Sequence, residues 1–487
     1  MKRRVSQLRQ GQSAGGVIAV LAVCSTCVLF LWMAAAGRQR PATLLLMLLV
    51  ALYIPFLVNR GKRLWLAALP LLVFWIPGPL VGFPLGPLRG LTLVEALVLL
   101  ALAAAAAKAL SAREDLQPLG LRSFPWAGFL AFFAGAALAY LYAFRTGEEL
   151  PVLRTIVFFP FALGLLVMVV VRDVKDALKL LWVLVAAATV IGIVFVLGSR
   201  GIGPFSPSSY ALGSGRASMS MNLPYLGTLA LNPAGTADTF AFAFSVAWFL
   251  LLTSAAGPKR LAAGAAAAVF ATVAVSAQGR TAITACALSV TVFGIWAVLR
   301  GSAERRVALV ATGAGLGGVV GVTVYLALHT RNAAYAARVL VLTSAPGSDA
   351  NLAGRFLGWR QGLIHAMSHP EGLGLFSPPY GGGSTWAVHN LWLFCALSIG
   401  WLGLAGLVLI LVRFGRVFIA GTRSGNADGA RLAALGLVLL GNIVVIGMAD
   451  PLLWGSYDAV MVWAPLWIAF AGVVRCKARL SVVGHHR

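Results

Sequence analysis

Residues 389–412 read HNLWLFCALSIGWLGLAGLVLILV, and this stretch contains no Asp, Glu, Lys or Arg. A helix that crosses the hydrocarbon core of a membrane, about 30 Å thick, needs roughly 20 mostly apolar residues. Similar runs recur along the whole chain, in which 60% of the 487 residues are hydrophobic and 11% are charged. Because soluble domains carry about a quarter charged residues, the sequence excludes a water-soluble enzyme and predicts an all-α, polytopic bundle of transmembrane helices.

The apolar runs divide the chain into about 12 to 14 spans of membrane length. They predict four regions: N-terminal transmembrane helices at 1–197, central helices at 198–328 with an outer loop at 198–232, a large outer loop at 329–388, and C-terminal helices with a cytoplasmic tail at 389–487. We place the spans near residues 15–36, 42–58, 64–81, 91–110, 124–144, 152–171, 178–197, 233–254, 261–278, 281–299, 307–328, 389–412, 431–449 and 455–474.

The formal net charge of +24 follows from membrane topology rather than from a nucleic-acid surface. When the N-terminus is placed inside, most Lys and Arg residues fall in cytoplasmic loops, whereas the reverse orientation breaks the positive-inside rule at nearly every loop. We therefore expect cytoplasmic N- and C-termini and no nucleic-acid partner. The cytoplasmic clusters include Lys2-Arg3-Arg4, Arg60/Lys62/Arg63, Lys259-Arg260, Arg305-Arg306, Arg413/Arg416 and Arg475/Lys477/Arg479.

The outer loop at 329–388 is the longest polar segment, and long loops of this kind are usually functional or disordered. Within it, the stretch from Arg355 to Met367 has helical apolar spacing, which predicts an amphipathic helix lying on the membrane surface. The stretch His369-Pro370 is expected to end this helix. The expected apolar stripe consists of Phe356, Leu357, Trp359, Leu363, Ile364 and Met367.

Five polar residues fall on the outer side in this topology: Arg280, Arg355, Arg360, His389 and Asp450. Arginines at an outer interface suit a diphosphate, which they bind through charge-assisted and often bidentate hydrogen bonds. A His at a helix N-terminus lies near the positive end of the helix dipole, which disfavours imidazolium, and a neutral imidazole is what a general base near pH 7 requires. Asp450 is expected to orient that imidazole or to stabilise its protonated form.

Each of these residues also has a structural interpretation. An Arg at a membrane boundary is commonly a snorkelling anchor, an interfacial His is commonly a satisfied polar residue, and Asp450-Pro451 is ordinary turn chemistry. Taken alone, the set supports an outward-facing anion site.

Two weaker candidates lie elsewhere on the outer side. Arg216, in the 198–232 loop, is either a contact for a glycan lipid or an anchor. Asp238 is either functional, because carboxylates within the membrane are costly, or a cap of its own helix. His329, His365 and His369 lack carboxylate neighbours at metal-ligand spacing, so we predict no metal.

The region from Gly354 to Gly400 resembles the signature of the O-antigen ligase and O-antigen polymerase family of bacterial membrane glycan transferases. An earlier turn, in which Arg280 stands four residues after Ser276, also resembles the arginine-bearing turn of that family. The specific likeness covers this region and this turn, while the multi-span layout extends it loosely to the whole chain. The residues that carry it are Gly354-Arg355-x-x-x-Trp359, His369-Pro370-x-Gly372-x-Gly374, His389-Asn390-x-x-Leu393 and Gly400.

This resemblance implies a metal-independent glycosyltransferase without a cofactor, located in the bacterial inner membrane with its active site facing the periplasm. The implied donor is a glycan on undecaprenyl diphosphate, and the implied acceptor is a glycan, lipid or protein hydroxyl. By position, Arg280 and Arg355 correspond to diphosphate contacts and His389 to the base. We group Arg360 and Asn390 with the substrate-binding residues, while Asp450 is a looser match. Family members often have fewer spans, and residues 1–150 carry no family feature.

Several alternatives remain open at this level. A ligase, a polymerase and a protein glycosylation enzyme share the same donor and the same chemistry, and the oligomeric state is unknown. A second class of function, a flippase or transporter for a polar lipid, needs polar helices along a path through the bilayer. Glu95 and Asp458 are the main charged residues within the predicted spans that suit this path. A third class is a structural scaffold for cell-wall enzymes.

Overall fold

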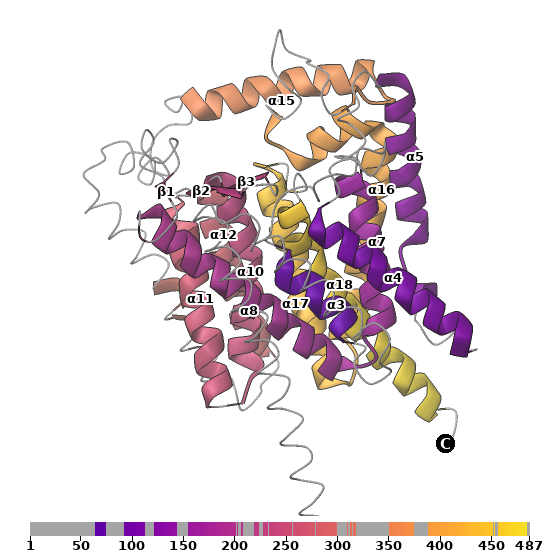
Figure 1. Cartoon of the computed structure of the whole chain (residues 1–487), viewed down its shortest axis with the longest axis vertical. Coiled ribbons are helices and arrows are strands. Elements are labelled where there is room, and N and C mark those ends of the chain that lie inside the picture. Colours follow the sequence, from indigo (N-terminus) through magenta and orange to yellow (C-terminus); the bar gives the residue numbers. More distant parts are fainter. Residues whose placement is uncertain are drawn as a thin grey trace, which may run out of the picture.

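The computed structural model describes most of the predicted helices (Figure 1). The described residues are 64–74, 92–112, 121–143, 154–200, 202, 206–207, 219–223, 227–231, 233–255, 257–277, 279–299, 309, 312–313, 315–317, 350–374, 388–450, 452 and 456–484. The predicted spans at 15–36 and 42–58, most of the span at 307–328, and Arg216 lie outside the described residues.

The described chain folds as a bundle of α-helices, which confirms the all-α, polytopic prediction. Apolar runs become helices because a lipid environment leaves no partner for backbone N–H and C=O groups other than the helix itself. The helices are α3 (Trp65–Val73), α4 (Leu93–Ala112), η4 (Leu121–Ser123), α5 (Trp126–Ala143), η5 (Arg154–Phe158), α7 (Phe159–Val170), α8 (Val174–Ser199), α10 (Pro233–Thr253), α11 (Pro258–Ser276), α12 (Arg280–Leu299), α15 (Ala350–Ser368), α16 (Leu391–Thr422), α17 (Ala427–Gly447) and α18 (Ser456–Gly484).

Within the described residues, seven helices are long and apolar enough to cross a membrane, so the chain is a multi-pass membrane protein. Three shorter apolar helices, in α4, α5 and the η5–α7 segment, occupy the predicted spans at 91–110, 124–144 and 152–171. The seven membrane-length stretches are Val174–Ser199, Gly235–Thr253, Pro258–Ser276, Arg280–Ala297, Leu391–Thr422, Ala427–Gly447 and Ala459–Cys476.

The centre of the bundle is α18, which packs against α7, α8, α10, α16 and α17. Its Trp463 and Trp467 are fully buried, and the indole N–H of Trp467 donates to the carbonyl of Pro160 at 3.0 Å. Gly164 of α7 lies directly against the Trp467 ring, where a Cβ would collide with it. Buried indoles stabilise best when the N–H has a partner, so α7 and α18 fit together in one register.

Helices α5 and α16 pack closely against each other. Gly135 of α5 faces Gly403 of α16, and Gly406 of α16 faces the backbone of Phe132. A Cβ at Gly135 would collide with Gly403 N, and a Cβ at Gly406 would collide with Phe132 N, so neither position leaves room for a side chain against the partner backbone. Small residues allow helix backbones to approach closely in membranes, so these glycines set the distance between the two helices.

The expected outer loop at 198–232 contains a small antiparallel sheet in the order β1 (Ser206–Pro207), β2 (Met219–Leu223) and β3 (Gly227–Leu231). The register of β2 and β3 runs from Met219↔Leu231 to Leu223↔Gly227. Only an outer loop was predicted for this segment, so the strands are an addition to the expected fold. Such short strands give almost no periodic signal, and their pairing depends on a partner strand.

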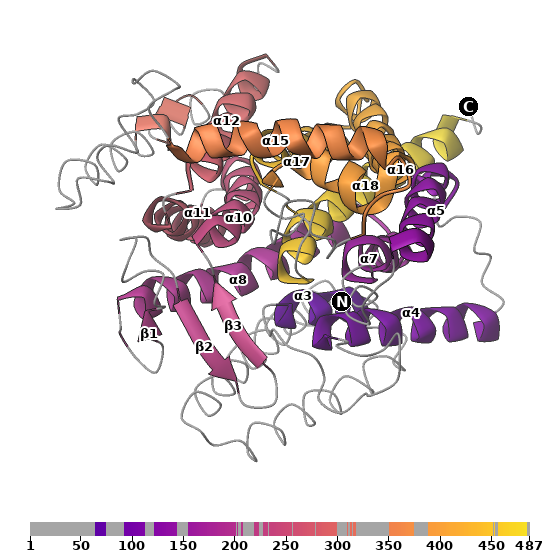
Figure 2. The same cartoon turned by 90° about the horizontal axis from the view of Figure 1, so that it is seen from above.

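Helix α15 crosses the end of the bundle at which β3 leads into α10 (Figures 1 and 2). It includes the predicted helix of the outer loop and begins at Ala350, before the expected Arg355. Gly362 and Ala366 are buried against α16. Of the predicted apolar stripe, Trp359 packs against this cluster, whereas the remaining five side chains are exposed: Phe356, Leu357, Leu363, Ile364 and Met367. That this face lies on a membrane surface stays a prediction.

Candidate functional site

The start of α16 fixes the predicted base, His389. Asn390 caps the helix, because its side-chain Oδ1 accepts the backbone N–H of Leu393 at 3.0 Å. The residue before the cap, His389, has a φ of 42°, and no other non-glycine residue in the described chain has a positive φ. A left-handed conformation costs a non-glycine residue about 1 to 2 kcal/mol, and such strained residues cluster at functional sites. The backbone therefore holds the imidazole in a direction that an ordinary helix start does not give.

The predicted partner of His389 is in contact with it. Asp450 follows α17, where its backbone N–H donates to Ile446 O at 2.9 Å and continues the last helical turn. His389 Nδ1 and Asp450 Oδ1 are 3.2 Å apart, and the side chains are 46% and 15% exposed. A carboxylate on Nδ1 selects the tautomer that carries the proton there, which leaves the Nε2 lone pair available. The pair thus presents an oriented and exposed imidazole.

Asp450 belongs to a turn that three side chains contact, which we call the 448–450 turn. Asn390 Nδ2 donates to Met448 O at 3.3 Å, and Arg355 Nη1 donates to Ala449 O at 3.0 Å. Together with the His389 contact, these bonds join the start of α16, the N-terminal part of α15 and the end of α17. The structure therefore brings together four predicted site residues that lie on three separate segments.

Asn390 was predicted to bind substrate, whereas in the structure its side chain contacts the protein itself. Its side chain is buried, and both ends of its amide bond protein atoms, namely Leu393 N and Met448 O. No partner within the protein was predicted for this amide. The N-cap preference of Asn before an apolar run was the available signal for one of the two bonds.

Helix α16 is interrupted at Gly400, which has a φ of 74° and a ψ of 174°. The segment 369–374 enters this break, because Trp401 N donates to Pro370 O at 3.0 Å and Leu373 N donates to Leu397 O at 2.6 Å. The Trp401 indole N–H also donates to Ala366 O of α15 at 2.7 Å. These bonds attach α15 to the short first part of α16, which begins beside His389.

The span predicted at 389–412 lies within the membrane-length helix Leu391–Thr422, but the break at Gly400 was not predicted. A Cβ on Gly372 would lie 2.6 Å from Gly400 N, and a Cβ on Gly400 would lie 2.6 Å from Glu371 O and Pro370 O. Both residues also have a positive φ, which favours glycine. Two of the glycines that carry the family resemblance are therefore explained by close backbone contact.

Arg280 is the first residue of α12 and is exposed. The preceding Gly279 packs against Ala237 of α10, and Thr281 Oγ1 donates to Asp238 Oδ1 at 2.9 Å. Asp238 lies beyond the first turn of α10 and bonds the start of α12 instead of capping its own helix. The buried carboxylate therefore joins α10 to the segment that carries Arg280.

Arg360 does not accompany Arg355 to the 448–450 turn. It is exposed on α15, on the side that also carries Phe356 and Leu363, whereas Arg355 contacts the 448–450 turn. Residues 355 and 360 differ by 140° around a helix of 3.6 residues per turn, so one helix face cannot present both.

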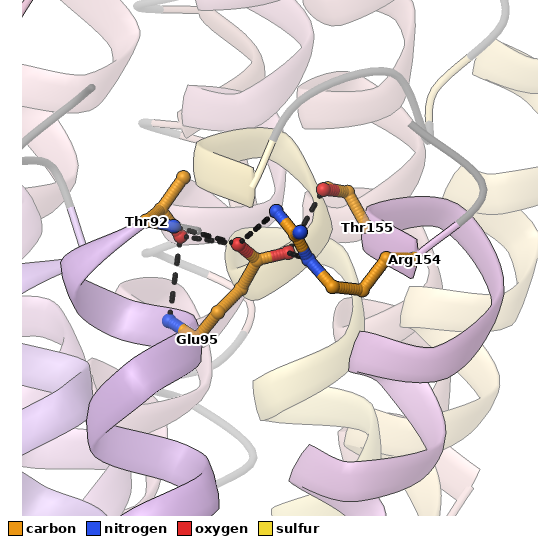
Figure 3. A network of polar contacts seen from close by, with 4 residues as sticks. All are labelled: Thr92, Glu95, Arg154 and Thr155. Atoms are coloured by element: carbon orange, nitrogen blue, oxygen red, sulfur yellow. Dashed lines mark hydrogen bonds and ion pairs between the residues drawn. The ribbon is translucent and has the colours of Figure 1, made fainter. Parts of the chain in front are cut away.

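Glu95, the residue that suited a transport path, is 2% exposed and engaged by three neighbours (Figure 3). Arg154 donates to its two carboxylate oxygens from Nε at 3.2 Å and from Nη2 at 3.0 Å, and Thr155 Oγ1 donates at 2.9 Å. Thr92 donates from its backbone N at 2.8 Å and its hydroxyl at 3.0 Å, while Glu95 N donates back to that hydroxyl at 3.3 Å.

This network is a capping box at the start of α4 combined with a buried ion pair to η5. Arg154 lies 59 positions along the chain from Glu95, so sequence spacing gave no sign of their contact. The Glu95 carboxylate accepts hydrogen bonds from both segments, and it therefore holds the start of α4 against the η5–α7 segment. The side chain of Asp458, the other residue considered for transport, is outside the described part of the molecule.

The described residues contain no group of three or more His, Cys, Asp and Glu side chains that suits a metal ion. What the described residues do assemble is an exposed, oriented imidazole beside an arginine at one end of a membrane bundle. No family model matches the chain, and no curated protein matches it.

Proposed function

We propose that the chain is a membrane glycosyltransferase of the O-antigen ligase or polysaccharide polymerase type. It moves a glycan from undecaprenyl diphosphate to an acceptor hydroxyl at the outer face of the bacterial inner membrane. The observation that carries the proposal is the contact of 3.2 Å between His389 Nδ1 and Asp450 Oδ1, on a turn whose Ala449 carbonyl also binds Arg355.

The contact supports a role for His389 as a general base. With Nδ1–H donating to Asp450, Nε2 accepts the proton of the acceptor hydroxyl. The acceptor oxygen then forms a bond to the anomeric carbon of the glycan, while the bond from that carbon to the phosphate oxygen breaks. The electron pair leaves with undecaprenyl diphosphate, and the imidazolium that forms is stabilised by the Asp450 carboxylate.

Arginine chemistry supports the assignment of the donor. A guanidinium has five N–H donors, and the single bond from Arg355 Nη1 to Ala449 O leaves further donors for a ligand. Arg280, exposed at the start of α12, is the second cation of the proposed diphosphate contact. Charge-assisted hydrogen bonds from both would stabilise the negative charge that develops on the leaving group.

The acceptor separates the variants of this function. A ligase transfers the finished glycan to a lipid acceptor, a polymerase extends the glycan on its own carrier, and a third variant modifies protein. All three use the same donor chemistry, so the test must read both the acceptor-linked and the lipid-linked glycan.

The test is the glycan profile of a deletion strain complemented with the wild-type protein or with His389→Ala. For a polymerase, the variant should lose long chains and leave single repeats on the acceptor. For a ligase, it should lose all acceptor-linked glycan and accumulate long chains on undecaprenyl diphosphate. A His389→Ala protein that is inserted at wild-type levels and restores both pools contradicts the assignment of the base.

The chain offers a matched control in His369→Ala. Contrary to the expectation from the sequence, His369 has a carboxylate neighbour: its Nδ1 lies 3.3 Å from Glu371 Oε1, and its side chain is 44% exposed, so the two residues form a second histidine–carboxylate pair. This variant should keep transfer. If the deletion itself leaves both glycan pools unchanged, flipping of a labelled polar lipid in reconstituted vesicles becomes the next assay, with Glu95→Gln as its test variant.

A further inference from the structure

Three polar side chains meet inside the bundle, away from the 448–450 turn. Ser245 of α10 and Ser289 of α12 are 2.7 Å apart between their hydroxyl oxygens, and Asn442 Nδ2 of α17 donates to them at 2.8 Å and 3.3 Å. All three side chains are fully buried. Each serine oxygen also lies 2.7 to 2.8 Å from the carbonyl one helical turn before it. We call this the Asn442 cluster.

The hydrogen bonding of the cluster fixes its geometry. A serine hydroxyl has one proton, so one serine must donate to the other while the second bonds its own helix. Asn442 Oδ1 is buried without a hydrogen-bond partner among the described residues. A buried acceptor without a partner is costly. A lone buried Asn between packed helices is a known means of specifying one register.

The cluster links the two helices that support the proposed diphosphate site. Helix α12 begins with Arg280, and α17 ends at the 448–450 turn, to which Arg355 is bonded. At 1.5 Å per residue, Ser289 lies about 13 Å along α12 from Arg280, and Asn442 lies about 9 Å along α17 from Met448. Because α12 and α17 pack against each other, a bond between them sets the position of one end relative to the other.

We propose that Asn442 is a positioning residue that sets the spacing between Arg280 and Arg355, and with it the affinity for the donor diphosphate. The inference rests on the proposed function, since it takes these arginines as diphosphate contacts. Asn442 acts through the helices and does not touch the ligand. It holds α10 and α12 through the hydrogen bonds from its Nδ2 to the hydroxyl oxygens of Ser245 and Ser289.

The first measurement is the Kd of undecaprenyl diphosphate for the purified full chain, with undecaprenol as the lipid without phosphate. We expect Asn442→Leu to weaken binding of the diphosphate by roughly three- to fifteenfold, the range of single interhelical polar contacts in membranes. Ser245→Ala combined with Ser289→Ala removes the same bonds without added bulk and should give a similar loss. Ile443→Leu, a buried apolar exchange at the next position of α17, is the control and should bind normally.

A double-mutant cycle separates positioning from general loosening. In an Arg280→Ala background, Asn442→Leu should cause little further loss of diphosphate binding, because the spacing matters only when both arginines are present. Additive losses, or equal losses for undecaprenol and the diphosphate, overturn the inference. If Arg280→Ala itself leaves diphosphate binding unchanged, the proposed role of Arg280 as a diphosphate contact is wrong.

The second measurement needs no ligand and therefore tests the register by itself. Thr284 of α12 and Val444 of α17 are exposed, so spin labels there report the distance between the two helices. The labels require a background in which the five native cysteines are replaced. Loss of the Asn442 cluster should shift or broaden the distance distribution, whereas Ile443→Leu should not. An unchanged distribution in both cluster variants overturns the inference.

Discussion

Replacing Gly400 with Ala should open the contact between the segment 369–374 and the break in α16. Gly400 has a φ of 74° and a ψ of 174°, a region that costs other residues about 1 to 3 kcal/mol. Its new Cβ would lie 2.6 Å from two carbonyl oxygens, so the segment must move away and lose the bonds to Trp401 N and Leu397 O. With each bond contributing about 0.5 to 1.5 kcal/mol, the local contact loses about 2 to 6 kcal/mol.

Hydrogen exchange followed by mass spectrometry measures this loss where it occurs. Peptides that contain Leu373 and Trp401 should exchange about 30-fold faster or more, since local opening reports the free energy of the contact. Glycan transfer should fall as well, because the first part of α16 positions His389 beside Asp450.

The control is Gly425→Ala, after the other end of α16. Gly425 has no positive φ, and a Cβ there meets no atom within 4 Å, so exchange and transfer should stay normal. Equal exchange and equal transfer for Gly400→Ala and Gly425→Ala would refute the explanation of the break.

Three further predictions concern the packing around the site. Asn390→Ala removes both the cap and the bond to Met448 O and should destabilise the start of α16 by about 1 to 2 kcal/mol, measured as faster exchange there without loss of inserted protein; unchanged exchange contradicts the capping role. Glu95→Gln removes the negative charge from a pair in which the Glu95 side chain is 3% exposed and that of Arg154 is 12% exposed, and it should cost about 3 kcal/mol, the lower end of the range for buried pairs. Thermal unfolding should show this loss and partial recovery when Arg154→Met is added, and no recovery would mean that the pair is not the cause. Gly406→Leu places a side chain against the α5 backbone and should lower the amount of folded protein in membranes, whereas wild-type levels would contradict the close packing.

The helices were predictable because bilayer physics acts on short stretches of chain. The spans expected at 233–254 and 281–299 correspond to α10 (Pro233–Thr253) and α12 (Arg280–Leu299). An apolar run in lipid satisfies its backbone only as a helix, whatever its neighbours are. The sequence therefore located these elements within a few residues, and Asn390 before an apolar run also marked a helix start.

The site was predictable in part, and the limit has a physical cause. Topology and resemblance indicated that Arg355, His389 and Asp450 lie at one membrane face, and the structure brings all three to the 448–450 turn. Arg360 was grouped with them because it is close in sequence, but it lies on another side of α15. The roles of these residues in transfer stay predictions.

By itself, the sequence determined the class of fold, the approximate positions of the spanning helices that the structure describes, and the set of polar residues available at their ends. Only the tertiary structure decided which of those residues meet. The break at Gly400, the Glu95–Arg154 pair and the Asn442 cluster all join segments far apart in the chain. Local propensity and hydropathy depend on neighbouring residues, whereas these contacts depend on how helices pack, and in a membrane close packing and interhelical hydrogen bonds decide that arrangement.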